Sequence, residues 1–138
     1  MIKYILTFVA FLLLNCECFP SQVDTTLASR VAKNFYWERL PHETTLEYDQ
    51  IRLNLVYTKS VNDTALYYIF NVYKENGFVI VAAEDGVFPV LGYSFRGQYV
   101  RDNQAPAFTN WMHVYAEQIA LVKRKPELIN REAQSIWD

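Results

Sequence analysis

Hydrophobic residues recur every three or four positions early in the chain, and this spacing predicts an amphipathic helix. Asp24 or Thr25 begins it, because either side chain can accept a hydrogen bond from the unpaired backbone N–H groups of a first turn. Pro41 ends it, since proline disrupts a continuing helix. The predicted apolar stripe consists of Leu27, Val31 and Phe35, with Ala28, Ala32 and Tyr36 beside them.

The same spacing returns near the end of the chain and predicts a long helix from about Pro106 to Arg124. Proline is favourable at a first helical position, and Pro126 stops the pattern. The predicted buried stripe contains Phe108, either Trp111 or Met112, Tyr115, Ile119 and Val122. Residues 127–138 form a C-terminal tail with a weaker helical pattern.

The region between the two helices reads as a series of strands. Residues 51–58 alternate between apolar and polar, and residues 65–73 are apolar at nearly every position. A third strand covers 78–83, and a fourth begins at Pro89 and runs to Ser94. Residues 95–100 either continue the fourth strand or form a small fifth one.

Turn residues separate these strands. Ser60–Thr64 reads as a turn, and Lys74–Gly77 reads as a hairpin turn in which Asn-Gly tolerates positive φ. Sequential hairpins produce an antiparallel sheet. The sequence therefore predicts an α+β fold: an antiparallel sheet of four or five strands with an N-terminal helix and a long C-terminal helix, both expected on one face.

The first 18 residues resemble a secretory signal peptide. Lys3 precedes an apolar run that is shorter than the roughly 20 residues of a spanning helix, and a buried N-terminal helix is the less favoured reading. Residues 13–16 have the outline of a bacterial lipoprotein box that would lipidate Cys16, although Asn15 departs from it. Cleavage near Cys18 is the competing reading. Either way the protein is expected outside the cytoplasm, periplasmic or secreted, or lipid-anchored at a bacterial membrane.

Composition narrows the function classes. Cys16 and Cys18 are the only cysteines, so the chain from residue 19 has no disulfide, cysteine-ligated metal or cysteine nucleophile. The net charge is −2 and stays −2 without residues 1–18, because Lys3 and Glu17 cancel. No basic patch suggests nucleic acid. A length of 138 residues indicates one domain.

Catalytic chemistry has little support in the sequence. His42 lies in a polar loop, and His113 lies beside the apolar stripe, where a polar contact is favoured over a general base. Glu84 and Asp85 precede Gly86, so a turn explains them. No G-x-S-x-G motif is present. We expect no enzyme activity, no metal and no cofactor.

The segment that enters the last helix is the best interaction candidate. It runs from Val100 to Phe108 and changes from polar to small to apolar. A rigid proline after small residues can present backbone to a groove at low entropic cost. From pattern alone, a plain helix-entry loop is the favoured alternative.

Two strand motifs and a helix resemble a known family. These are Gly77–Ala82, Pro89–Ser94 and Trp111–Ile119, together with the spacing from Asn103 to Trp111. They resemble the prodomain of streptopain-type cysteine proteases and the free-standing streptopain inhibitors that copy it. The residues that carry the resemblance, here called the scaffold motif, are Gly77, Phe78, Leu91, Gly92, Tyr93, Trp111 and Tyr115.

The resemblance implies that the sheet and helices support a loop that enters the protease active site. On this chain the loop consists of Asn103, Gln104, Ala105, Pro106, Ala107 and Phe108. Family members often present an Asn near the helix entry. Pairing on Tyr115–Ile119 places that position near Ala107 rather than at Asn103, so the residue that enters the site stays open.

The resemblance also implies a partner. A zymogen would continue past Asp138 into a catalytic domain, so we expect a prodomain-like inhibitor domain at 19–126 that acts in trans and without covalent chemistry. Its partner would be a streptopain-type cysteine protease, and the free chain would be a monomer. The alternatives are an extracytoplasmic module that binds another protein or a peptide, and an enzyme of unrecognised type.

Overall fold

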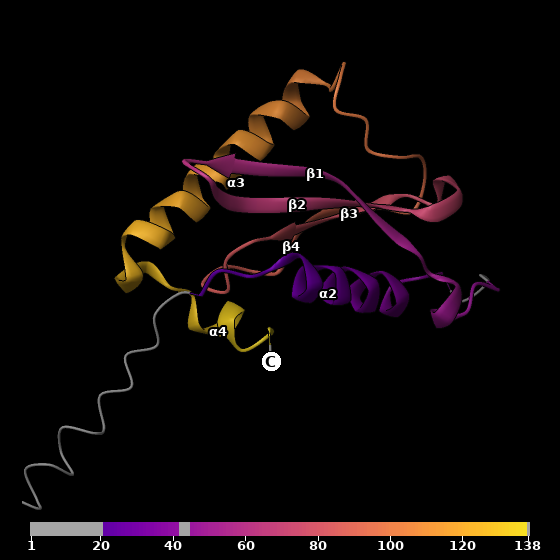
Figure 1. Cartoon of the computed structure of the whole chain (residues 1–138), viewed down its shortest axis with the longest axis horizontal. Coiled ribbons are helices and arrows are strands. Elements are labelled where there is room, and N and C mark those ends of the chain that lie inside the picture. Colours follow the sequence, from indigo (N-terminus) through magenta and orange to yellow (C-terminus); the bar gives the residue numbers. More distant parts are fainter. Residues whose placement is uncertain (1–20, 42–44, 138) are drawn as a thin grey trace, which may run out of the picture.

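The computed structural model describes residues 21–41 and 45–137. The predicted signal peptide with Cys16 and Cys18, and also His42, lie outside the described residues. Figure 1 shows helices packed around one sheet. The elements are α2 (Thr25–Glu38), β1 (Leu53–Val61), β2 (Thr64–Val72), β3 (Phe78–Ala82), β4 (Val90–Ser94), α3 (Pro106–Arg124) and α4 (Arg131–Gln134), with 3-10 turns at Tyr48–Gln50, Tyr73–Glu75 and Pro126–Leu128.

The sheet has four strands in the order β1-β2-β3-β4, and every neighbouring pair is antiparallel. This confirms the α+β prediction in its four-strand form. Residues 95–100 form no strand; their one ladder contact is an isolated bridge between Asn76 and Gly97. β1 and β4 are therefore the two edges of the sheet.

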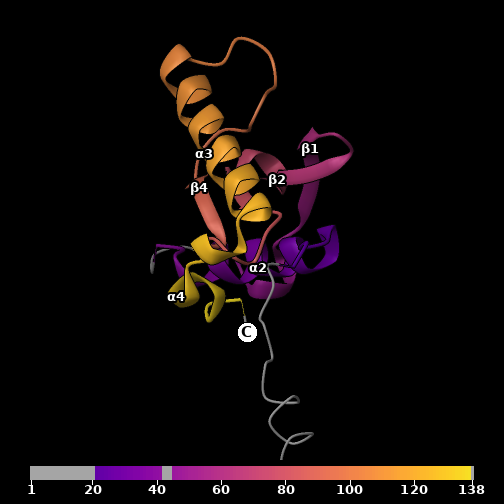
Figure 2. The same ribbon diagram turned by 90° about the vertical axis from the view of Figure 1, so that its left-hand side faces the viewer.

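The two long helices lie on opposite faces of the sheet, so the prediction that both cover one face is wrong (Figures 1 and 2). Successive side chains of a strand point to opposite faces. One cluster joins α2 to Tyr68, Phe70, Val72, Val79, Val81 and Ala83. The other joins α3 to Leu66, Tyr67, Ile69, Ile80, Ala82 and Leu91. The nearly continuous apolar run of β2 exists because both of its faces are buried.

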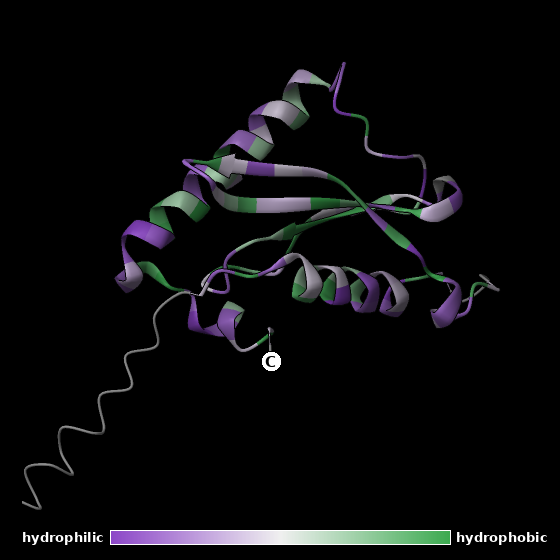
Figure 3. Cartoon of the chain, viewed as in Figure 1, coloured by the Kyte–Doolittle hydropathy of each residue, from purple (hydrophilic) through white to green (hydrophobic). Residues whose placement is uncertain are grey.

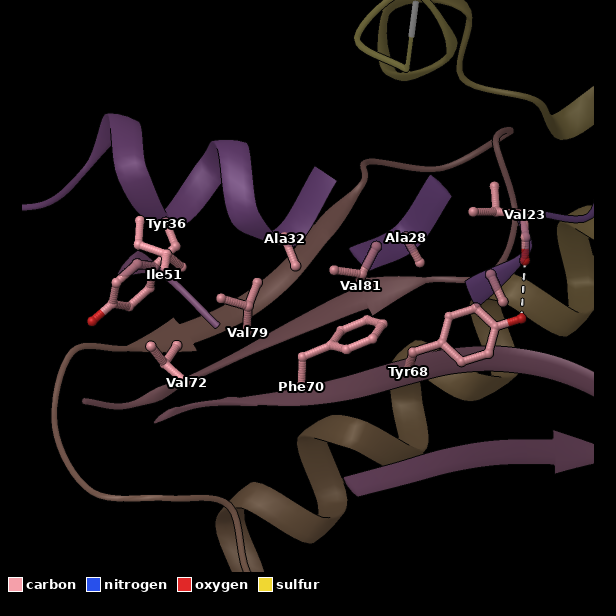
Figure 4. Close-up of a cluster of buried hydrophobic side chains, with 11 residues drawn as sticks. Val23, Ala28, Ala32, Tyr36, Ile51, Tyr68, Phe70, Val72, Val79 and Val81 are labelled. Atoms are coloured by element: carbon pink, nitrogen blue, oxygen red, sulfur yellow. Dashed lines mark hydrogen bonds between the residues drawn. The ribbon is translucent and has the colours of Figure 1, made fainter. Parts of the chain in front are cut away.

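The α2 helix begins as predicted. Asp24 is its N-cap, and the carboxylate accepts a hydrogen bond from the Leu27 N–H at 2.8 Å. The buried line is Ala28, Ala32 and Tyr36, and these residues face the sheet (Figure 4). The stripe of Leu27, Val31 and Phe35 is only half-buried and flanks that line. Two alanines at the contact allow the helix backbone to approach the strands closely.

The α3 helix has the predicted bounds but a shifted contact face. Its buried residues are Met112, Ala116, Ile119 and Val122. Trp111 keeps 46% of its surface exposed, so Met112 is the member of the predicted pair that enters the core. Ala116 was missed because alanine carries little weight in a hydrophobic pattern. In Figure 3 hydrophobic and hydrophilic residues alternate along α2 and α3, as expected for helices with one buried side.

The turn between β1 and β2 is tighter than predicted. Asn62 and Asp63 alone connect β1 to β2, with φ of 48° and 60°, so this is a two-residue hairpin turn. Between β2 and β3, Lys74 and Gly77 have positive φ (62° and 112°), whereas Asn76 has φ −79°. The Asn-Gly prediction is therefore right for the glycine and wrong for the asparagine.

The C-terminal tail packs onto the domain. Ala133 on α4 is fully buried, and Asn130 caps that helix by accepting the Ala133 N–H at 3.1 Å. The Trp137 indole N–H donates to the Val87 carbonyl at 2.9 Å, and its side chain contacts both hydrophobic clusters. The tail thus bridges the two faces of the sheet.

Gly77 should be the least replaceable glycine. A methyl group there would lie 1.8 Å from the Ser94 carbonyl oxygen, at a backbone φ of +112°. We expect Gly77→Ala to lower the free energy of unfolding by at least about 3 kcal/mol in urea denaturation. Gly97→Ala is the matched control: its φ is +71° but nothing lies within 4 Å, so only backbone strain of about 1 kcal/mol is expected. Equal losses in the two variants would contradict the steric argument.

Candidate functional site

The predicted interaction loop, residues 103–108, lies in the connection from β4 to α3. Figures 1 and 2 show this connection leaving the sheet and reaching the free end of α3. Four of the six residues are exposed, and Gln104 and Phe108 are half-buried. Figure 3 shows that the tip is hydrophilic. The loop is therefore open to a partner molecule.

Local contacts give the loop a defined shape. Asn103 adopts φ +59°, a left-handed conformation that asparagine tolerates better than most residues. The Gln104 side-chain amide donates to the Val100 carbonyl. Ala105 is the N-cap residue of α3 and makes no side-chain cap, and Pro106 opens the helix. Small residues at this point leave the backbone accessible.

A buried asparagine fixes the base of the loop. The Asn71 amide on β2 donates to the Tyr99 carbonyl at 3.1 Å, and its oxygen accepts the Tyr99 N–H at 2.8 Å. Asn71 is only 8% exposed. The side chain thus pairs with the backbone of Tyr99 much as a neighbouring strand would. The sequence analysis missed this residue, although one amide inside the apolar run of β2 was a usable signal.

Aromatic packing completes the anchor. The Tyr99 ring lies 5.8 Å from that of Tyr57, 6.3 Å from Phe78 and 6.2 Å from Phe108, measured between centroids. Burial, and secondarily the neighbouring Tyr57, raises the pKa of the Tyr99 hydroxyl. Phe108 is the last residue of the predicted loop, so both ends of the projecting segment rest on one aromatic cluster.

The structure brings most of the scaffold motif together on the α3 face of the sheet. The Trp111 ring lies over Gly92 of β4: a methyl group at that glycine would be 3.5 Å from the ring, an ordinary van der Waals contact. The Trp111 and Tyr115 rings are 5.3 Å apart, and Leu91 is buried in the same cluster. Tyr93 is separate: its ring packs against Phe35 of α2 at 5.0 Å.

Glu84 forms a buried ion pair with Lys123, so the prediction that it is an ordinary turn carboxylate is wrong. It is 1% exposed and lies 2.6 Å from the Lys123 ammonium. Burial raises the pKa of Glu84, and Lys123 opposes part of that shift. Asp85 lies in the turn, but its carboxylate accepts the Ser21 N–H at 2.7 Å, a contact across 64 residues of sequence. Glu84 joins the end of β3 to α3 and faces no open site.

The remaining chemistry of the described residues is sparse. His113 is largely exposed and lies 3.4 Å from Glu117, a surface polar contact as predicted. Within residues 21–41 and 45–137, no group of His, Cys, Asp and Glu has the geometry of a metal site. No helix in those ranges is long and apolar enough to cross a membrane. The arrangement presents a shaped loop on a rigid base, which suits insertion into a partner.

Comparison with known proteins gives two matches. The family model of the Spi protease inhibitor matches residues 20–119. The thiol protease/hemagglutinin PrtT of Porphyromonas gingivalis is 31% identical over 119 residues, which cover 84% of this chain and 14% of the relative. The chain therefore spans about one seventh of that relative's length. No solved structure matches the chain significantly.

The hydrogen bonds between Asn71 and Tyr99 should keep the backbone at the base of the loop ordered. Asn71→Ala leaves the Tyr99 N–H and carbonyl without partners, and we expect a loss of about 2 kcal/mol in unfolding free energy. Hydrogen exchange of the Tyr99 amide should accelerate. Asn110→Ala, an exposed site on α3, should change stability by less than about 0.5 kcal/mol. Unchanged Tyr99 protection in Asn71→Ala would refute the anchoring role.

The Glu84 pair should make stability depend on pH. Lys123→Met removes the cation and raises the pKa of the buried carboxyl further. A folded pKa above the unfolded one gives stability that is present below the unfolded pKa and lost as pH rises through the folded pKa. We therefore expect a loss of about 3 kcal/mol at neutral pH that shrinks towards about pH 4, measured by urea denaturation. Lys125→Met removes the same charge from an exposed position and should show neither effect.

Proposed function

The chain belongs to the Spi protease inhibitor family, and on that premise we propose that it inhibits a streptopain-type cysteine protease by placing the loop Asn103–Phe108 in the active-site cleft. The family is one of protease inhibitors rather than enzymes. The proposal adds the class of protease, the mimicry of a prodomain and the surface that enters the cleft.

The relative supports the choice of protease class. PrtT is named a thiol protease, and a segment similar to this chain makes up 14% of its length. A domain of this kind thus occurs in one polypeptide with a protease that uses a thiol. The proposed partner of the present chain, acting in trans, is a protease of that chemical class.

The loop carries the proposal physically. Its residues are mostly exposed, while Asn71 and the Tyr99 aromatic cluster hold its base. A loop already held in its binding shape loses little conformational entropy on docking. An interface of standard size buries about 1,600 Å² in total, and nanomolar affinity corresponds to about −12 kcal/mol. In a cysteine protease the enzyme thiolate is the nucleophile, and the side chains of the loop offer it no electrophile, so we propose reversible, non-covalent inhibition.

An edge-strand binding module is the second candidate. β4 is an edge strand without lysine or internal proline, features that usually protect such edges from pairing. An apolar hollow beside it is lined in part by the exposed side chains of Phe88, Leu121 and Leu128. An extended peptide added to β4 would place side chains in this hollow. In this reading the protein binds a peptide segment without inhibiting a protease.

Residues 1–18 support export. Lys3 and the apolar run after it are typical of a secretory signal, so we place the inhibitor in the periplasm or outside the cell. Lipidation at Cys16 would keep it at the membrane surface. Mass spectrometry of the protein isolated from its producing cells distinguishes a lipidated Cys16 from cleavage near Cys18.

Titration of the purified protein into an activated streptopain-type protease tests the proposed function. We expect hydrolysis of a small peptide substrate to stop near a one-to-one ratio. Ala107→Arg adds bulk at an exposed position and should weaken inhibition at least about tenfold, equivalent to about 1.4 kcal/mol. Asn103→Gly tolerates the left-handed backbone and removes the whole side chain, so it reports whether the Asn103 side chain enters the site.

Gln98→Ala is the matched control, since Gln98 is exposed in the same connection but lies before the Tyr99 anchor. It should inhibit like the parent protein. Full protease activity at micromolar excess of inhibitor, across several such proteases, would overturn the inhibitor proposal and favour peptide binding at β4.

A further inference from the structure

A hollow of about 410 Å³ lies beside the loop, between the β1 edge and the first turns of α3. Gln104 and Phe108, two residues of the proposed protease-binding loop, form part of its wall. Except for the apolar Met112, the other lining residues are aromatic, cationic or small and polar: Tyr57, Lys59, Tyr67, Tyr99, Arg101, Thr109 and His113.

Tyr67 is the unusual member of this wall. Its side chain is buried, at 5% exposure, yet its hydroxyl makes no hydrogen bond to any described residue. Among the described residues, Glu84 Oε1 is the one fully buried side-chain oxygen that has no hydrogen-bond partner. The Tyr67 hydroxyl also has no partner, so it must be accessible from outside. A buried phenol normally finds a partner for its O–H. The Tyr67 hydroxyl therefore opens into the hollow with its hydrogen-bonding capacity unused.

Lys59, Arg101 and His113 line the same hollow as Tyr67. Lys59 is the direct partner of Tyr67 in the β1–β2 ladder, so the two side chains share one face of the sheet. The Arg101 guanidinium carbon lies 5.7 Å from the Tyr57 ring centroid, which keeps the cation over the hollow. His113 completes this side of the wall.

No residue that lines the hollow carries a carboxylate. The nearby acidic residues do not line it: Glu117 is 3.4 Å from His113, and the exposed Asp102 follows Arg101 and is near enough to contribute to the raised pKa of Tyr99. A cavity with several donors and cations but no anion of its own is complementary to an anionic group.

We propose that this hollow binds the carboxylate of an acidic side chain on the target protease, with Tyr67, Arg101 and Lys59 as its ligands. The inference rests on the proposed function, because the hollow shares Gln104 and Phe108 with the inhibitory loop and the two surfaces would meet the same partner. The aromatic walls contact the aliphatic part of the acidic side chain. The loop would occlude the cleft while the hollow fixes its orientation from the rim.

Inhibition of the protease tests the docking role. Tyr67→Phe removes one hydroxyl and keeps the ring, and Arg101→Gln removes one charge from an exposed residue. Each should raise the inhibition constant about tenfold or more, as expected for a lost hydrogen bond to a charged group. Arg124→Gln, an exposed arginine at the other end of α3, should leave it unchanged. Thermal unfolding of each variant confirms that the fold persists.

A second measurement reads the site without the protease. NMR spectra of the purified protein are recorded with the peptide acetyl-Glu-Glu-Glu-amide and with acetyl-Lys-Lys-Lys-amide. We expect the acidic peptide alone to shift the signals of Lys59, Tyr67 and Arg101, and Arg101→Gln to abolish those shifts. Absence of shifts in the parent protein would overturn the site whatever the protease assay shows.

The two arms separate the two hypotheses. A parent protein that fails to inhibit but binds the acidic peptide would end the proposed function and leave the carboxylate site standing. A parent protein that inhibits, with Tyr67→Phe and Arg101→Gln inhibiting equally well, would end the docking role of the hollow while the inhibitory loop remains.

Discussion

The structure depends on one constraint: the two central strands are apolar on both faces, so both faces must be covered. β2 is buried at every position from Leu66 to Val72, and β3 is buried from Val79 to Ala82. A single helix layer would leave half of those side chains in water. α2 and α3 therefore take opposite faces, and the connection from β4 leads onto the α3 face, where Tyr99 contacts Asn71 of β2 and Tyr57 of β1. The exposed loop lies between that contact and the start of α3.

Side-chain contacts hold the connection from β4 to α3 in place. Asn71 replaces the strand partner that Tyr99 lacks, and it does so from inside the apolar run of β2. Burying an amide costs free energy unless its hydrogen bonds are made. Here one residue of the connection, Tyr99, pairs with both the N–H donor and the oxygen acceptor of Asn71. Two of the rings that hold Tyr99, those of Tyr57 and Phe108, also line the hollow beside the loop. Scaffold and binding surface thus share side chains, so mutations at this end of the sheet will affect stability and recognition together.

The sequence predicts the elements better than their arrangement. Pro106 and Pro126 frame α3 and give its limits, and Asp24 marks the start of α2, because capping and proline effects are local. The placement of helices on faces is not local, yet β2 held the clue, since alternation is absent where both faces are buried. Glu84 was misread because its neighbours suggest a turn, and its partner Lys123 is distant in sequence. The candidate loop came from resemblance, whereas Asn71 and Tyr67 required three-dimensional proximity.

Because Trp137 contacts both hydrophobic clusters, it affects the order in which parts of the protein can fold during synthesis. During synthesis the sheet and both long helices leave the ribosome before Trp137 does. The seam between the two layers then closes last, when the indole reaches the Val87 carbonyl. A nascent chain would hold a nearly finished domain with an open seam until Trp137 emerges, and burial of that indole would change its fluorescence.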